Sequence, residues 1–214
     1  MIPKKKRLRA AVEAGLEFFF ILIYVWFLAP SSPGWLQAGF FWVFCVGFPL
    51  ICIGLGEKPL PEFSLDWAAF IKSLRWLVWF TLGATVFLAA MAIALESFHY
   101  DGRLLNRFSE YVFWAFLQEI GFQTFLTRRV HMAVGRPHAS AVVSCTIFAL
   151  LHFPNPVLMA FSWIGGFFWA LSFIRAPNLY AISVSHGWLA VIVLYCSPKS
   201  WLHGLRVGPG YWTY

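Results

Sequence analysis

The sequence predicts an all-α polytopic membrane protein with about seven transmembrane helices packed into one bundle. Hydrophobic residues make up 60% of the 214 residues and charged residues only 12%, whereas soluble domains run nearer about one half and one quarter. Mean hydropathy is +0.71, and no Asp, Glu, Lys or Arg occurs between Phe18 and Gly56. This balance excludes an ordinary soluble domain.

The apolar stretches are separated by turn-forming or charged segments, each of which marks the end of a span. Pro30 to Gly34 divide the first two stretches, and a polar loop is expected at 57–66, followed by an interfacial segment at 67–75. A helix of roughly 20 residues crosses a bilayer. We therefore expect spans at 11–29, 35–55, 75–95, 109–127, 138–153, 157–174 and 179–196, all in a single membrane domain over residues 1–214. The tail from Ser197 is expected at the interface.

Basic residues lie at the ends of the apolar stretches, so the net charge of +7 is interpreted as a topology signal rather than a nucleic-acid surface. With the N-terminus in the cytoplasm, twelve Lys and Arg residues fall inside and four outside, which agrees with the positive-inside rule. We expect an integral protein of a bacterial inner membrane. The inner residues are Lys4, Lys5, Lys6, Arg7, Arg9, Lys58, Lys72, Arg75, Arg128, Arg129, Arg136 and Arg175, and the outer ones are Arg103, Arg107, Lys199 and Arg206.

Five polar residues lie where the bilayer makes them costly, because an unpartnered ionisable group at that depth costs several kcal/mol. Glu119 lies in the fourth predicted span with Gln118 beside it and Gln123 four residues on. His152 ends the fifth span, and His186 lies within the seventh. Such residues either form a hydrogen-bonded packing cluster between helices or line a cavity. If they converge in one buried site, they supply a general base, its partner and an oxyanion donor.

The cysteines and the remaining histidines carry no predicted chemistry. The four cysteines form no CxxC pair and are interpreted as small buried hydrophobic residues. Zinc held by Glu119, His152 and His186 is an alternative, but no HExxH or other close ligand spacing supports it. We therefore expect no metal and no cofactor. We assign no role to His99, His131, His138 or His203.

Three short motifs together resemble the type II CAAX prenyl endopeptidases and their bacterial relatives, the CPBP or Abi family. That family carries Glu-Glu-x-x-x-Arg in one helix, Phe-x-x-x-His in the next and His-x-x-x-Asn in a later one. Here the matching stretches begin at Gln118, Phe148 and His186, in the same order and spacing, and the resemblance covers roughly residues 75–196. It implies an all-helical intramembrane protease, in which a Glu and a His activate water while the later His and Asn stabilise the oxyanion.

The sequence departs from the family pattern at three positions. Gln118 replaces the first Glu, Gln123 the Arg and Ala190 the final Asn. An amide is not a general base, and the loss of a carboxylate together with its cationic partner avoids an unpaired charge in the membrane. Only Glu119, His152 and His186 keep the polar groups of the motifs.

Two functions follow as hypotheses. The first is a membrane-embedded endopeptidase that cleaves a hydrophobic or lipid-bearing peptide or transmembrane segment. In it Glu119 is the base, His152 orients the water and His186 stabilises the oxyanion. Gln118, Gln123 and Asn155 are expected to bind substrate, Asn155 standing in for the absent Asn. The second is a catalytically inactive scaffold of the same fold that binds a partner helix through paired amides.

Overall fold

The computed structural model describes residues 3–56 and 60–213, and it contains helices and no strands within those ranges. The all-α prediction is confirmed. The first two predicted spans form a helical hairpin. The first arm is α1 (Lys4–Ile23), continued by η1 (Tyr24–Leu28) and α2 (Ala29–Ser31), and the second is α3 (Gly34–Phe40), η2 (Phe41–Gly47) and α4 (Phe48–Gly56). The predicted loop at 57–66 lies partly outside the described residues, and its described part contains the short helix η3 (Pro61–Phe63).

The third and fourth spans are longer than predicted. Helix α5 (Trp67–Ala94) is continuous, so residues 67–75 belong to the same helix as the third span, and their place at the interface stays a prediction. The side chain of Asp66 accepts hydrogen bonds from the amides of Ala68 and Ala69 and so starts the helix earlier. The fourth runs through α6 (Leu104–Glu119), the π-helical segment η4 (Ile120–Thr127) and α7 (Arg128–Val134). It passes the arginines at 128–129, where we expected it to end.

The last three long helices begin at a proline or at a capping asparagine. Helix α8 (Pro137–Leu150) and helix α9 (Pro156–Arg175) both have proline at the first position, where no backbone donor is lost. The side chain of Asn178 caps helix α10 (Leu179–Cys196) by accepting from the amide of Ala181. The C-terminal tail forms three short helices: α11 (Lys199–Leu202), η5 (His203–Leu205) and η6 (Gly208–Tyr211).

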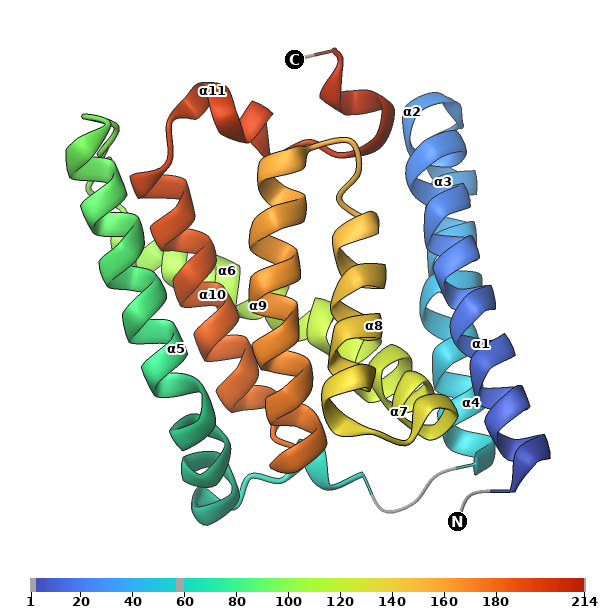
Figure 1. The fold of residues 1–214 in the computed structure, drawn as a ribbon. Helices are drawn as coiled ribbons and strands as arrows, with labels where there is room; N and C mark the ends of the chain where they lie inside the picture. The colour runs from blue at the N-terminus through green and yellow to red at the C-terminus, as the bar shows by residue number, and fades with distance from the viewer. Residues whose placement is uncertain (1–2, 57–59, 214) are drawn as a thin grey trace.

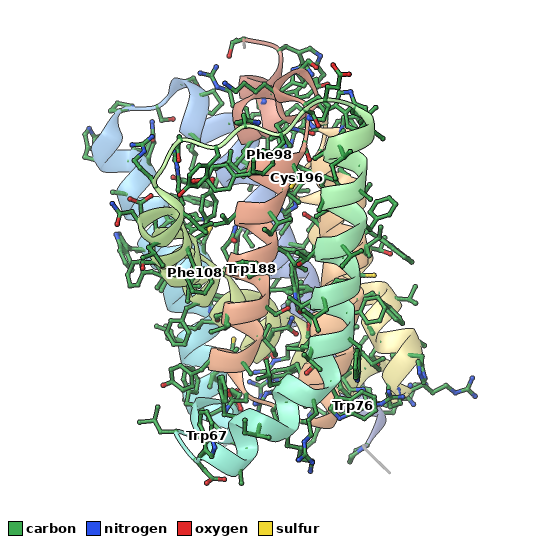
Figure 2. All side chains as sticks on the ribbon, turned by 90° about the vertical axis from the view of Figure 1, so that its left-hand side faces the viewer. Trp67, Trp76, Phe98, Phe108, Trp188 and Cys196 are labelled. Atoms are coloured by element: carbon green, nitrogen blue, oxygen red, sulfur yellow. The ribbon has the colours of Figure 1, made fainter. Side chains whose placement is uncertain are left out.

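Helix α10 lies at the centre of the site-bearing part, packed against α5 on one side and α6 on the other, while α8 packs against α9. Figure 1 shows α5, α10, α9 and α8 in sequence across the bundle, with α6 and α7 passing behind them and the N-terminal hairpin at the far edge. Figure 2 shows α10 between α6 and α5, with Trp188 of α10 beside Phe108 of α6.

Close approach of α6 and α10 depends on a glycine. A Cβ at Gly187 would lie 2.6 to 2.7 Å from backbone and side-chain atoms of Val112, so no larger residue fits without moving the helices apart. Small residues at such crossings let membrane helices pack through van der Waals contact, because the hydrophobic effect does not drive them together in lipid. This crossing lies one residue from His186.

Several described helices are long and apolar enough to cross a membrane, so the chain is an integral membrane protein. Five helical stretches meet both criteria: Lys4–Ser31, Gly34–Leu55, Trp67–Ala94, Pro156–Arg175 and Leu179–Cys196. Helix α8 is apolar but shorter, and the α6–α7 helix carries several charges. The chain ends lie at opposite ends of the bundle (Figure 1), which an odd number of crossings requires. The count of seven stays a prediction.

Candidate functional site

Glu119 and His186 form a buried hydrogen-bonded pair between α6 and α10. The Nδ1 atom of His186 lies 2.8 Å from Oε1 of Glu119, and the carboxylate is fully buried while the imidazole is 14% exposed. A carboxylate only accepts, so Nδ1 carries the proton and donates it. The opposite nitrogen, Nε2, is left with its lone pair. In the neutral imidazole, this hydrogen bond therefore selects the tautomer whose Nε2 lone pair is unprotonated.

The His186 ring is held from a second side by Trp169 of α9. The two rings stack at a centroid separation of 4.1 Å and an interplanar angle of 21°. The indole itself is anchored, because its Nε1 donates to Oγ of Ser185, 3.1 Å away. Gly165, one turn earlier in α9, leaves room for the indole ring, which a Cβ there would meet at 2.7 Å. Three helices thus restrict the rotation of one imidazole.

His152 presents a second imidazole to the same region. Its Nδ1 donates to the carbonyl oxygen of Phe148 at 2.9 Å, so its Nε2 also carries a lone pair. The Phe148 ring makes edge contacts with both imidazoles, at centroid separations of 4.9 Å to His152 and 6.3 Å to His186. The two histidines therefore contact the same phenyl ring, each with Nδ1 engaged.

Both histidines line a cavity of about 270 Å³ between α5, α6, α9 and α10. Its wall is mostly apolar, and its mouth includes Phe87, which is 65% exposed, and Trp114, which is 54% exposed. Apolar residues exposed on a membrane protein face lipid, so we expect the cavity to open towards the bilayer. Its polar lining residues are Tyr111, Gln118, His152, Ser162 and His186.

The structure separates the three family positions that differ in this sequence. Gln118 and Ala190 line the cavity with the histidines. Gln123 does not line it, since its side chain is fully buried within η4. Glu119 is likewise fully buried and lies behind His186 as seen from the cavity. Of the predicted set, Gln118, His152 and His186 therefore surround the cavity.

Asn155 lies outside the cavity wall, and its polar atoms are already engaged. Its Oδ1 accepts from the amide of Leu158 and caps α9, while Nδ2 donates to the carbonyl oxygens of Leu202 and Arg206. These bonds tie the start of α9 to the C-terminal tail, whose Leu205 does line the cavity. The contacts give Asn155 a structural task. An Asn directly before Pro is a helix-start signal, so the capping of α9 could have been predicted from it.

In the part of the chain that the structure describes, no three His, Cys, Asp or Glu side chains gather in a way that could hold a metal ion. Two of the residues considered for zinc, Glu119 and His186, bond to each other instead. The expectation of a metal-free site stays a prediction. The four cysteines are free thiols, three of them buried.

Sequence reasoning missed a second set of buried charges, which joins α1 to α7. Glu13 of α1 pairs with Arg129 at 2.5 Å and with Arg9 at 2.6 Å, and Arg129 also donates to the carbonyl oxygen of Cys52. Glu17, one turn on, is 2% exposed. The spacing of two carboxylates at i and i+4 on an apolar helix was the available signal.

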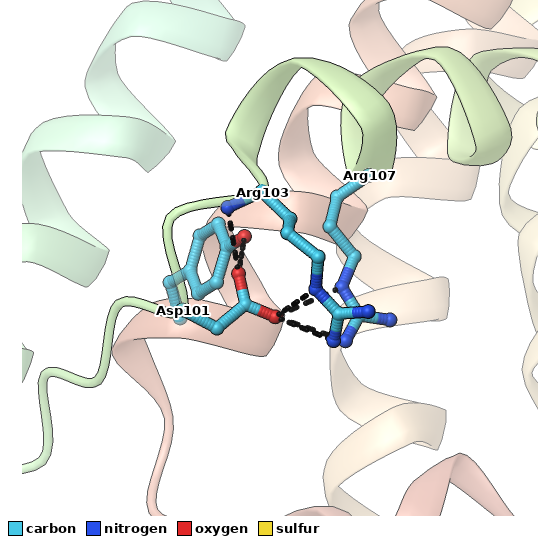
Figure 3. Close-up of polar contacts among 4 residues, drawn as sticks. Asp101, Arg103 and Arg107 are labelled. Atoms are coloured by element: carbon cyan, nitrogen blue, oxygen red, sulfur yellow. Dashed lines mark hydrogen bonds and ion pairs between the residues drawn. The ribbon is translucent and has the colours of Figure 1, made fainter.

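A third polar cluster lies in the loop before α6, outside the spans. Asp101 accepts from the hydroxyl of Tyr195 at 2.7 Å and from the guanidinium groups of Arg103 and Arg107 (Figure 3). The Tyr195 hydroxyl, with the backbone amide of Arg103 and the two guanidinium groups, holds the pKa of Asp101 well below its usual range. The cluster fastens the end of α10 to the start of α6.

The fold and the site define a class: a polytopic α-helical membrane protein with a buried Glu–His pair beside an apolar intramembrane cavity. Residues 78–192, more than half of the chain, match the type II CAAX prenyl endopeptidase Rce1-like family. The chain therefore belongs to this family of CAAX-protease-like membrane endopeptidases, as its motifs predicted. No curated protein and no solved structure matches the chain.

Proposed function

We propose that this protein is an intramembrane endopeptidase in which His186 is the general base and Glu119 its orienting partner. The observation that carries the proposal is the 2.8 Å bond from Nδ1 of His186 to Glu119, which leaves Nε2 basic beside the cavity. This assignment differs from the roles expected from the family motifs. Because Glu119 lies behind the imidazole, it acts through His186 and does not reach the water itself.

The reaction proceeds in two proton transfers. A water oxygen attacks the carbonyl carbon of the scissile peptide bond, and Nε2 of His186 takes a proton from that water. Glu119 stabilises the imidazolium that forms, as the carboxylate does in a Ser-His-Asp triad. His186 then returns the proton to the leaving amine, and the C–N bond breaks to give a carboxylic acid and an amine.

His152 and Gln118 serve the same step from the cavity wall. Nε2 of His152 accepts the second hydrogen of the water and so orients its lone pair towards the substrate. The carboxamide of Gln118 donates to the developing oxyanion, a task for which an amide suits better than the carboxylate it replaces. The change from Glu to Gln at this position is thereby compatible with hydrolysis.

The substrate class follows from the cavity. Its mostly apolar wall and its expected opening on the lipid side suit a hydrophobic or lipid-bearing peptide, or a transmembrane segment, that reaches the site from within the bilayer. The charge distribution supports a cytoplasmic N-terminus and fits a bacterial inner membrane. No nucleic-acid partner and no cofactor is required by this mechanism.

The test is a cleavage assay on the purified, reconstituted protein, with peptides from its native membrane as substrates and mass spectrometry as readout. Wild type and His152→Ala are compared with His131→Ala, whose imidazole bonds to Ser140 at a distance from the cavity. Cleavage that His152→Ala lowers strongly and His131→Ala leaves intact supports the proposal. Equal rates for all three forms refute the role of His152.

A second candidate function is a catalytically inactive scaffold that binds its partner helix. It is favoured by Gln118, which places an amide in the cavity at the position of the family's first Glu. This function predicts that the same assay retains peptides at unchanged mass, with no cleavage in wild type. Loss of retention in Gln118→Leu would then locate the binding site.

A further inference from the structure

A row of polar side chains continues from Glu119 along the α6–α7 helix, away from the cavity. The row comprises Glu119, Gln123, Thr124 and Thr127, which are all between 0 and 1% exposed. Their apolar neighbours in sequence, among them Phe122 and Leu126, pack into the hydrophobic core. The polar residues are therefore confined to one strip of an otherwise apolar helix.

The helix in this stretch is π-helical, which brings the polar residues closer to one line. In a π-helix the backbone bonds run from i to i+5, so residues at i+4 and i+5 both lie above residue i. Gln123 and Thr124 consequently follow Glu119 on the same side, and Thr127 follows Gln123. Such segments are rare and occur frequently at functional sites.

The side chains in this row have atoms without hydrogen-bond partners among the described residues. They are Oε2 of Glu119, both amide atoms of Gln123, and the hydroxyl oxygens of Thr124 and Thr127. The fully buried hydroxyl of Ser144, on the adjoining helix α8, likewise has no hydrogen-bond partner among the described residues. Each buried polar group left unsatisfied costs about 1–3 kcal/mol, so several together in one strip indicate a polar ligand.

Water fits this strip better than a charged or bulky ligand. Amide and hydroxyl groups offer both donors and acceptors, and buried water makes about three hydrogen bonds to groups of this kind. The strip ends at the charged residues 128–129, where Arg128 pairs with Glu62 and Arg129 with Glu13. This is the end of the bundle at which the N-terminus lies (Figure 1), so the strip runs from the Glu119–His186 pair towards the aqueous phase.

We propose that Glu119, Gln123, Thr124 and Thr127 hold a file of ordered water that connects the buried carboxylate with the aqueous side near the N-terminus. The file is separate from the substrate cavity, since neither Glu119 nor Gln123 lines that cavity. Its use rests on the proposed function: it solvates the Glu119 carboxylate behind His186 and exchanges protons with it, while a hydrophobic substrate fills the cavity on the lipid side.

Cysteine accessibility tests the file without any substrate. Thr127→Cys and Thr124→Cys are treated with a small, water-soluble methanethiosulfonate in the reconstituted protein, and labelling of each peptide is followed by mass spectrometry. The matched control is Leu126→Cys, equally buried on the same helix but facing the apolar core. Native Cys145, fully buried on α8, is the internal reference.

Only a thiolate reacts with such reagents, and a thiolate forms only where water solvates it. We expect the two threonine positions to label about tenfold faster than Leu126→Cys, because a thiol in the dry core stays protonated. Equal, slow labelling at all three positions would overturn the proposal. Cysteine lacks the γ-methyl group of threonine and adds no bulk at either position, so these variants are expected to keep the fold.

A second variant tests what the file does. Thr127→Val keeps the side-chain shape and removes the hydroxyl, so it is expected to slow peptide cleavage severalfold while leaving the melting temperature unchanged. Unchanged cleavage would show that the reaction does not depend on the file. If the protein shows no cleavage, and Thr124→Cys and Thr127→Cys are still labelled, the proposed function is refuted and the water file is supported.

Discussion

The N-terminal hairpin and the site-bearing helices are held together by opposite means. In α10, eleven of 18 residues are buried, and most are apolar or small. In α1 only Ala10, Glu13, Ala14 and Glu17 of 20 residues are buried, and two of these four are carboxylates. The site-bearing helices pack mainly through shape, whereas the hairpin adds a buried ion pair, Glu13 with Arg129, to its apolar contacts. The site is thus built by close packing, and the hairpin is joined to it partly through paired charges.

The largest effect is expected from the site itself. His186→Ala removes the proposed base and should lower kcat/KM by about 100- to 10,000-fold, the usual contribution of general base catalysis. The measurement is peptide cleavage in proteoliposomes, with folding checked by the melting temperature. A rate within a factor of a few of wild type would place the chemistry elsewhere.

The attachment of the hairpin should be the most sensitive point of stability. Arg129→Met leaves Glu13 buried without its main partner and should cost about 3–5 kcal/mol in the free energy of unfolding, as broken buried ion pairs do. The double variant Glu13→Leu, Arg129→Met removes both charges and should recover most of that loss. Denaturant titration in detergent micelles measures both. A double variant as unstable as Arg129→Met alone would contradict the pairing as the cause.

For the site-bearing helices, the close packing of α10 against α6 predicts a loss of stability when a glycine at the crossing is enlarged. Gly187→Ala forces a methyl group against the backbone of Val112 and should cost about 1–3 kcal/mol through overpacking. The control is Gly83→Ala on α5, where nothing lies within 4 Å of the added Cβ. Melting temperatures of the two variants should separate clearly. Equal values would mean that α6 and α10 are less closely packed than the structure shows.

The smallest effect is expected outside the membrane, at Asp101. Its pKa is lowered in the folded protein, chiefly by the hydroxyl of Tyr195, so its contribution to stability is complete above the ordinary Asp pKa of about 3.9. It is lost as the pH falls below that value and through the folded pKa. The difference in melting temperature between wild type and Asp101→Asn should stay constant from pH 7 to 5 and shrink below about pH 4. A difference that does not change with pH would exclude this carboxylate as the source.

Much of the fold could be predicted because hydropathy alone identifies apolar spans. The continuation of α5 back to Trp67 could not be predicted. Lys72 and Arg75 indicate a membrane interface, but a helix can extend beyond the interface without a break. The helix after Glu119 was predicted to end too early, because Arg128 and Arg129 form ion pairs with Glu62 and Glu13 within a helix that continues past them.

The candidate site was predicted as a set of residues but not as a geometry. Motif spacing singled out Glu119, His152 and His186, yet only the packing of α6 on α10 shows that Glu119 bonds to His186. Asn155 was grouped with the site because of its type and position, whereas its bonds to the C-terminal tail are long-range and leave no trace in local sequence. Helix crossings decide which polar residues come into contact, and the hydrophobic periodicity of a sequence does not predict those crossings.

A double-mutant cycle on peptide cleavage tests the central claim most directly: Glu119 works through His186. The kcat/KM values of Glu119→Gln, His186→Ala and the double variant are compared with wild type in proteoliposomes. If Glu119 only orients and stabilises the His186 imidazole, the double variant is as slow as His186→Ala alone, because groups that act as a unit are not additive. If the two effects multiply, Glu119 acts on the water independently and the proposed division of roles is wrong.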